Sequence, residues 1–136
     1  MVSAAHQEVI SNWLGGGKGF KLLYRMSRDG KSNSAFHSKV DGKGATVTVI
    51  NVKNGNGNHI FGGYTGQSWG GSGYRNAGGN SFLFSLVPYK DFNQVPTKFS
   101  NHRYSEYSIY SVTHYGPCFG GGHDFCFNLD SNDYWF

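Results

Sequence analysis

The chain has 136 residues, of which 21 are glycine and 17% are aromatic. This length allows one domain with its own core but not two. Glycine without a strict period, mixed with many aromatics, excludes collagen and simple disorder and predicts short strands joined by tight turns. The net charge is +4, but only 15% of residues are charged and the twelve Lys and Arg are dispersed, which makes a nucleic-acid surface a poor interpretation.

The cellular compartment follows from what the sequence lacks. Residues 1–14 have no apolar core of a secretory signal, and no apolar run reaches the ~18 residues of a membrane span. Two cysteines are too few for a disulfide framework, and the chain has no Asn-x-Ser/Thr acceptor for N-glycosylation. We therefore expect a cytoplasmic protein in a reducing compartment, with its cysteines acting as small buried apolar residues.

The first forty residues predict two helices around one short strand. Apolar residues recur at helical spacing in residues 4–14 behind a Ser3 cap, and three glycines end this pattern. Residues 20–26 (FKLLYRM) read as a strand that enters the polar turn 27–30. Ser32 then caps a second helix over residues 33–40.

A β-hairpin is the central prediction for the next segment. Residues 45–53 are β-branched throughout, and the Asn/Gly cluster 54–58 joins them to a second strand that starts at His59. Gly62 and Gly63 interrupt that strand, and paired glycines in a strand mark a close approach of another backbone or of a large aromatic.

Further strands are predicted toward the end of the chain. Residues 66–80 read as a long loop without secondary structure, and residues 89–100 as a connection. The predicted strands are residues 81–88, 104–112 and 123–129. The last of these alternates, which places Phe125, Phe127 and Leu129 on one face.

Two motifs suggest chemistry, and neither is complete. Residues 66–70 fit G-x-S-x-G with Ser68 as nucleophile, but the glycines that follow exclude the helix that this hydrolase motif requires. His114, Cys118, His123 and Cys126 have the residue types of a zinc site, although strand alternation sends His123 and Cys126 to opposite faces.

A third alternative is a binding surface. Trp69, Tyr74 and Arg75 lie in the predicted loop, where aromatic and basic side chains could stack on sugars or bases. A hydrolase, a zinc-binding protein and a carbohydrate or nucleic-acid binder therefore stay open as alternatives to a protein-interaction domain.

The chain resembles the TLDc domain of the oxidation-resistance proteins, from about residue 20 to about residue 126. The similar motifs occur in the family's order and spacing at residues 22–25 (LLYR), 27–30 (SRDG), 35–37 (AFH), 41–44 (DGKG), 60–65 (IFGGYT), 68–69 (SW), 72–74 (SGY), 82–86 (FLFSL), 115–117 (YGP) and 119–124 (FGGGHD).

The resemblance implies a fold and a role. The fold is α+β, with two antiparallel β-sheets packed as a sandwich and helices at the edges. The role is non-enzymatic: a protein-interaction domain in protection from oxidative stress, with the vacuolar proton ATPase as a partner that it binds and regulates. No catalytic residue, cofactor or metal comes with the family. The motif residues that we expect at an interaction surface are Arg28, Asp29, Trp69, Tyr74, Arg75, His123 and Asp124.

The sequence departs from the family at a few positions. Lys31 stands where relatives often carry an aromatic, Val40 and Cys118 where Cys and Thr are common, and Ala45 where Pro is usual. The family normally continues through another loop to a last strand. Residues 1–136 therefore form a single TLDc-like domain in which residues 133–136 substitute for that strand, or one that lacks it. We expect the C-terminal aromatics to fold back onto the sheet.

Overall fold

The computed structural model describes residues 3–54, 57–77, 80–87, 96–100, 105–131 and 133–135. The helical elements in these ranges are α1 (Ala4–Trp13), α2 (Met26–Asp29), α3 (Asn33–Val40) and the 3-10 helix η1 (Ser105–Tyr107). The strands are β1 (Thr46–Asn54), β2 (Gly57–Thr65), β3 (Gly73–Arg75), β4 (Ser81–Val87), β5 (Thr97–Ser100), β6 (Ile109–Ser111), β7 (Cys118–Phe119), β8 (Phe125–Phe127) and β9 (Tyr134–Trp135).

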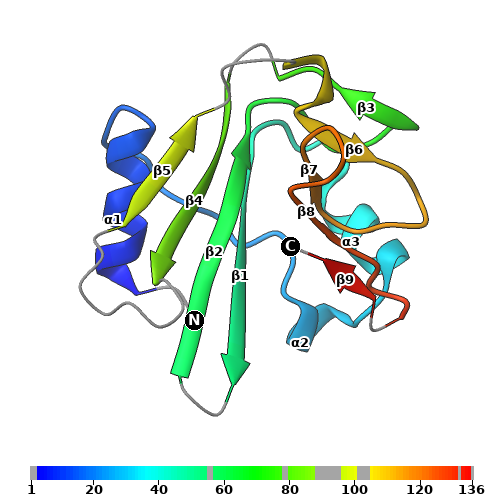
Figure 1. Cartoon of the computed structure of the whole chain (residues 1–136), viewed down its shortest axis with the longest axis horizontal. Helices are drawn as coiled ribbons and strands as arrows, with labels where there is room; N and C mark the ends of the chain where they lie inside the picture. The colour runs from blue at the N-terminus through cyan, green and yellow to red at the C-terminus, as the bar shows by residue number, and fades with distance from the viewer. Residues whose placement is uncertain are drawn as a thin grey trace.

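The strands form two sheets that are antiparallel throughout (Figure 1). Sheet 1 has the order β1-β2-β4-β5, and sheet 2 has the order β3-β6-β7-β8-β9. The predicted α+β class with two antiparallel sheets is confirmed. The predicted hairpin is confirmed as well, since β1 and β2 pair along their whole length from Thr46↔Thr65 to Asn54↔Gly57.

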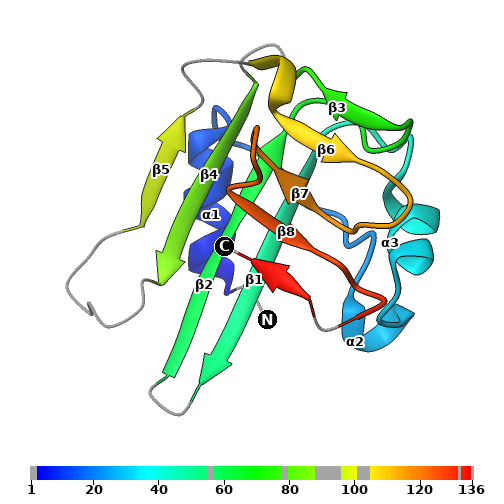
Figure 2. The same ribbon diagram turned by 45° about the vertical axis from the view of Figure 1, so that its right-hand side comes forward.

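Alternation along the strands of sheet 1 gives it two buried faces. Phe82, Phe84 and Leu86 point toward α1, where they pack with Ile10 and Ile60. Leu83, on the opposite face, packs into the space between the sheets. Figure 2 shows α1 behind sheet 1, with sheet 2 in front. Helix α1 covers the outer face of sheet 1 and adds a third layer to the sandwich.

The core between the two sheets is aromatic. Its buried members are Phe36, Val40, Phe61, Trp69, Ile109, Phe119, Phe125 and Leu129. Phe36 and Val40 come from α3, which closes this side of the sandwich, and the remainder come from both sheets and their loops. A fully buried side chain of this kind contributes about 1.5–3 kcal/mol by leaving water, so this cluster is the main support of the sandwich.

The paired glycines of β2 lie at close approaches, as predicted. A Cβ on Gly63 would be 2.6 Å from the Phe119 ring of sheet 2. A Cβ on Gly62 would meet the Thr48 carbonyl and the Phe84 ring. Glycine is needed at both positions because the neighbouring atoms leave no room for a side chain.

Two predicted helices are confirmed with their caps. Ser3 accepts a hydrogen bond from the His6 N–H at 3.1 Å, and Ser32 accepts one from the Ala35 N–H at 3.0 Å. These side-chain oxygens bind N–H groups that have no partner inside the first turn of a helix.

The predicted strand over residues 20–26 is wrong. Most of this segment has no regular structure, and its last residue begins the one-turn helix α2. Asp29 explains the helical turn, because its carboxylate accepts the Arg25 N–H at 2.8 Å. Phe20 and Leu22 are 41% and 49% exposed, so the apolar run is not drawn into a sheet.

Several predicted boundaries also change. The loop 66–80 contains β3, the connection 89–100 contains β5, and the strands predicted at 104–112 and 123–129 shrink to β6 and β8. The glycine turn before β8 limits that strand, since Gly120, Gly122 and His123 all have positive φ. Residues 1–2, 55–56, 78–79, 88–95, 101–104, 132 and 136 lie outside the described ranges, and so do the parts of our predictions that fall on them.

The backbone of the C-terminal segment pairs with sheet 2, as predicted. Strand β9 is antiparallel to β8, with Phe127 opposite Tyr134 and Cys126 opposite Trp135. The side chains of residues 134–136 lie outside the described part of the chain.

Among the described helices, none is both long enough and apolar enough to cross a membrane.

Candidate functional site

The structure divides the seven predicted surface residues among three places. Arg28 and Asp29 lie together in α2, Trp69 lies in the core between the sheets, and the remaining four lie at β3 and at the turn between β7 and β8. Only the third group contains residues from distant parts of the sequence that meet at the surface.

Arg28 and Asp29 form a local ion pair. The Arg28 Nε and Nη2 donate to the two carboxylate oxygens of Asp29, both at 2.8 Å. The hydrogen bond from Arg28, followed by that from the Arg25 N–H, lowers the pKa of Asp29 to about 2. This carboxylate is therefore charged at neutral pH. Its hydrogen bonds with Arg28 and with the Arg25 N–H stabilise α2.

Trp69 is a core residue, contrary to the prediction that it contributes to a surface. It is 1% exposed, its Nε1 donates to Thr46 Oγ1 at 2.9 Å, and its ring packs edge-on against Phe36 and Phe119. A buried indole cannot serve as a stacking platform for sugars or bases, so the proposed trio with Tyr74 and Arg75 is not formed.

Ser68 and Arg75 both bind backbone groups of loops. Ser68 Oγ accepts the Gly44 N–H at 3.2 Å and donates to the Trp69 carbonyl at 3.3 Å. The segment after Ser68 leads into strand β3 and not into the helix of a hydrolase elbow. Arg75 Nη1 donates to the Gly70 carbonyl at 2.8 Å, which fixes the turn at that glycine.

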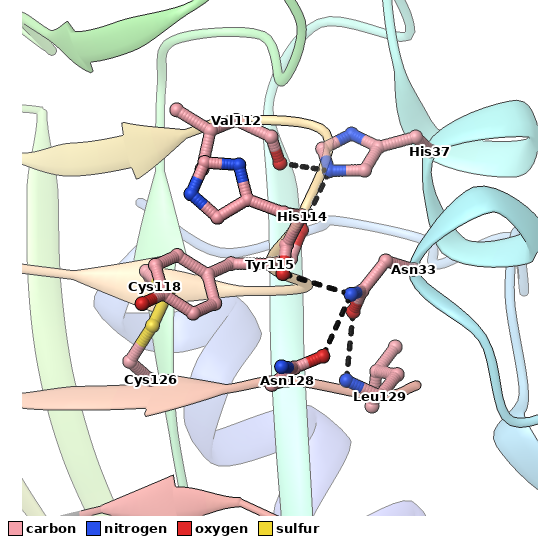
Figure 3. The surroundings of a disulfide bond; sticks show 9 residues. All are labelled: Asn33, His37, Val112, His114, Tyr115, Cys118, Cys126, Asn128 and Leu129. Carbon is pink, nitrogen blue, oxygen red and sulfur yellow. Dashed lines mark hydrogen bonds between the residues drawn. A yellow bond between two sulfur atoms is a disulfide. The ribbon is translucent and has the colours of Figure 1, made fainter. Parts of the chain in front are cut away.

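Cys118 and Cys126 form a disulfide bond between β7 and β8 (Figure 3). The two residues are direct partners in the strand register, with Cα atoms 4.1 Å apart, and both are fully buried. The expectation of two reduced, apolar cysteines is therefore wrong. The zinc alternative loses both of its thiolates, and the described residues contain no cluster of three or more metal-binding side chains.

The two histidines of the zinc alternative make aromatic contacts. The His114 carbonyl accepts a hydrogen bond from Asn33 at 2.9 Å, and its ring packs on Tyr115. The His123 ring lies nearly parallel to Tyr74, with centroids 6.1 Å apart, and also contacts Tyr110. The Tyr115 ring lies between the two histidines, with its centroid 4.7 Å from that of His114 and 6.4 Å from that of His123.

Asn33 is a buried polar residue that the sequence analysis did not single out. Its side chain accepts the Leu129 N–H at 2.7 Å and donates to His114 O and to Asn128 Oδ1 (Figure 3). These bonds tie the start of α3 to the loops on both sides of the disulfide hairpin. The only sequence signal was its place directly after the Ser32 cap.

His37, one turn further along α3, makes a second tie. Its Nδ1 lies 2.7 Å from Asp41 Oδ1, and its Nε2 lies 2.8 Å from the carbonyls of Val112 and Tyr115 (Figure 3). Oxygen atoms thus lie within hydrogen-bond distance of both ring nitrogens. Together with Asn33, this residue makes α3 a structural brace for sheet 2.

An aromatic surface lies at the end of sheet 2. The Tyr74 ring contacts Tyr107 edge-on at 5.0 Å and Tyr110 at 4.7 Å, in addition to His123. Tyr74 and Tyr107 are each 41% exposed, although large aromatics usually lie inside. Exposed rings that are held in place by other rings are typical of binding surfaces.

Next to these rings lies a pocket of about 710 Å³ between the two sheets. Its walls include Leu83 and Phe99 of sheet 1, and Tyr74, Tyr107 and the turn 120–122 on the side of sheet 2. Asp124 contributes a carboxylate. The volume falls in the range of ligand sites, about 300–1,000 Å³, so the pocket is the best candidate for a functional site.

The sequence analysis identified only part of this site. It predicted Tyr74 and Asp124, but it missed Phe99 and Tyr107, which lie in segments read as a connection and a strand. Phe99 is 56% exposed. An exposed Phe cannot be distinguished from a buried one by sequence pattern when its strand is only four residues long.

The comparisons with known proteins agree with the motifs. A family model for the TLDc domain matches residues 3–134, which is nearly the whole chain. No curated protein matches the chain.

Proposed function

Because this chain belongs to the TLDc family, we propose that it is a non-enzymatic protein-interaction domain that acts in protection from oxidative stress by binding and regulating the vacuolar proton ATPase. The TLDc domain is a domain of the protein-interaction type.

The observation that carries the proposal is the exposed aromatic surface beside the pocket, which from here on includes Phe99 of the pocket wall. Tyr74, Phe99 and Tyr107 are 41%, 56% and 41% exposed and come from three separate elements. Exposed aromatic side chains are enriched at protein interfaces, where they supply most of the binding energy. Rings that stay exposed to water add little to the stability of the fold, and a group of them on a protein surface marks an interaction site.

The residues considered for other chemistry have structural partners instead. Ser68 binds the backbone of two loops, the two cysteines are joined to each other, and Trp69 lies in the core. Among the residues that the structure describes, no specific contact favours the hydrolase, zinc or carbohydrate alternative over the interaction domain.

The test is direct binding to the pump. Purified vacuolar proton ATPase, solubilised in detergent, is passed over the immobilised chain, and retained ATPase and the rate of ATP hydrolysis are measured. We expect retention and a changed rate with the wild-type chain. Failure of the wild-type chain to retain any pump subunit would contradict the proposed partner.

Matched variants test whether the pump binds at the aromatic surface. Phe99→Ala and Tyr107→Ala are expected to reduce retention, because they remove exposed rings from the aromatic surface. Phe20→Ala removes an equally accessible ring (41% exposed) that does not line the pocket, and it should leave retention unchanged. Equal loss in all three variants would indicate nonspecific adhesion.

The proposal includes a cytoplasmic location, where the regulated face of such a pump is accessible. Both cysteines of the Cys118–Cys126 bond are fully buried, which keeps the reductants of that compartment away from the disulfide. Expression of the chain with a fluorescent tag, followed by fractionation, should place it in the cytosol and on pump-containing membranes. A purely luminal or secreted product would contradict this part of the proposal.

A further inference from the structure

We propose that the pocket binds the guanidinium group of an arginine carried by an extended segment of the protein partner. This inference rests on the proposed function, since it assigns the chemistry of the partner at the same surface. The geometry points to arginine through three features: the shape of the pocket, its charge and its rings.

Two walls of different character face each other across the pocket. On one side, Leu83 and Phe99 are register partners in β4 and β5, so their side chains stand on the same face of sheet 1. On the other side, the turn 120–122 packs beside Tyr107, and a Cβ on Gly121 would be 3.1 Å from the Tyr107 Cβ. The result is a slot between an apolar strand pair and a backbone turn.

Among the described residues that line the slot, Asp124 is the charged one. Asp124 is exposed, and its carboxylate lies over Gly120, where a side chain at residue 120 would collide with it. The Lys98 ammonium lies 5.2 Å from the centroid of the Phe82 ring, which also lines the pocket, but Lys98 is the neighbour of Phe99 in β5 and therefore points to the opposite face of sheet 1. A carboxylate beside aromatic rings is complementary to a cation.

The rings select the kind of cation. Tyr107 and Phe99 are half-exposed at the walls, and Tyr74 holds Tyr107 edge-on at 5.0 Å. A planar guanidinium stacks on aromatic faces and binds a carboxylate through two N–H donors at once, whereas an ammonium is more strongly hydrated and lacks the planar fork. Arginine therefore satisfies both the rings and Asp124.

Strand β5 is the reason that we propose an extended partner segment. It is the last strand of sheet 1, and among the described strands only β4 pairs with it. An extended segment that lies along β5 would direct alternate side chains to the same face as Phe99, toward the slot. A volume of about 710 Å³ leaves room for more than one side chain.

The test uses two peptides that differ in one side chain. The probe is acetyl-Thr-Val-Arg-Val-Thr-amide, and its control carries citrulline, the neutral isostere, in place of the arginine. Each is titrated into the isotope-labelled chain, and amide shifts and dissociation constants are measured by NMR. We expect the arginine peptide to shift the amides of residues 97–100 and 120–124 and to bind about tenfold tighter than the citrulline peptide.

Matched variants identify the carboxylate. Asp124→Asn should reduce affinity for the arginine peptide about tenfold and leave the citrulline peptide unchanged. Asp133→Asn removes an equal charge from another exposed site and should change neither. Tyr107→Leu should weaken both peptides, and a lysine peptide should bind more weakly than the arginine peptide.

The outcomes separate this inference from the proposed function. Equal binding of the two peptides, equal effects of the two Asp variants, or shifts confined to other parts of the molecule would overturn the arginine site. Pump binding without peptide selectivity would overturn the inference alone. Selective peptide binding without pump binding would support the arginine site and overturn the choice of the pump as partner.

Discussion

The side-chain oxygen of Asn33 accepts a hydrogen bond from the backbone N–H of Leu129 at 2.7 Å, across 96 positions of the chain. Asn33 is 1% exposed, so neither group can turn to water if the other is removed. The same side chain binds His114 O and Asn128 Oδ1. One amide group therefore connects α3 with both ends of the disulfide hairpin.

Asn33→Ala should destabilise the fold by about 2–4 kcal/mol, because it leaves several buried polar groups without partners. Urea unfolding followed by circular dichroism measures the change. Asn12→Ala, in the exposed part of α1, is the matched control and should stay within about 0.5 kcal/mol of wild type. Equal effects of both substitutions would contradict the role given to Asn33.

Gly63→Val should cost about 2–4 kcal/mol, since its side chain would enter the space of the Phe119 ring. The same unfolding experiment applies. Gly19→Val is the control, because a Cβ at Gly19 meets no atom within 4 Å. If the Gly63 variant melts within a degree of the wild type, the close approach of the two sheets does not constrain this position.

The disulfide should contribute about 2–3 kcal/mol, the magnitude that chain entropy gives for a short loop closed by residues eight positions apart. Unfolding with and without a thiol reductant measures this contribution in the wild type. The Cys118→Ala, Cys126→Ala double variant should unfold at the lower stability under both conditions. Two free thiols in the native protein by mass spectrometry would contradict the bond.

The pH dependence of the Arg28–Asp29 pair has a definite sign. Folding lowers the pKa of Asp29 from its ordinary value of 3.8 to about 2. The pair therefore adds stability above about pH 4, and this contribution is lost as the pH falls toward 2. Titration by carboxyl NMR should show that Arg28→Gln raises the pKa of Asp29, whereas Arg25→Gln, which keeps the backbone hydrogen bond, should not. Equal titration curves in both variants would show that the Arg28 hydrogen bond is not the cause.

Removal of residues 134–136 should lower stability and promote association, because β9 covers the outer edge of β8. An uncovered strand edge offers unpaired N–H and C=O groups to another chain. Light scattering coupled to size-exclusion chromatography measures the monomer fraction, with unfolding as a second readout. An unchanged monomer fraction and melting temperature would mean that β9 is not needed to cover the edge.

Local signals in the sequence predicted the elements that depend on local physics. The Ser32 cap defined the start of α3, and the Asn/Gly cluster defined the β1–β2 hairpin. Residues 20–26 were misread because β-propensity creates a strand only beside a partner edge, and the Asp29 carboxylate stabilises a helical turn instead.

The candidate site depended on contacts that no local pattern encodes. The disulfide required the register that aligns Cys118 with Cys126, which the turn of glycines and His123 sets. The pocket required β5, η1 and the β7–β8 turn to converge, and sequence alternation does not show which segments meet in space. The family motifs include Tyr74 and Asp124, but no motif includes Phe99 or Tyr107.

Sheet 1 separates two hydrophobic clusters, one under α1 and one against sheet 2. Ile10 and Trp13 of α1 pack only with the first cluster, so this helix can detach while the second cluster stays closed. The chain then behaves as two cooperative units that share one sheet. Amide protons of α1 should exchange with solvent deuterium through a partial opening, well before those of β2, β7 and β8, whose exchange requires the sandwich itself to open.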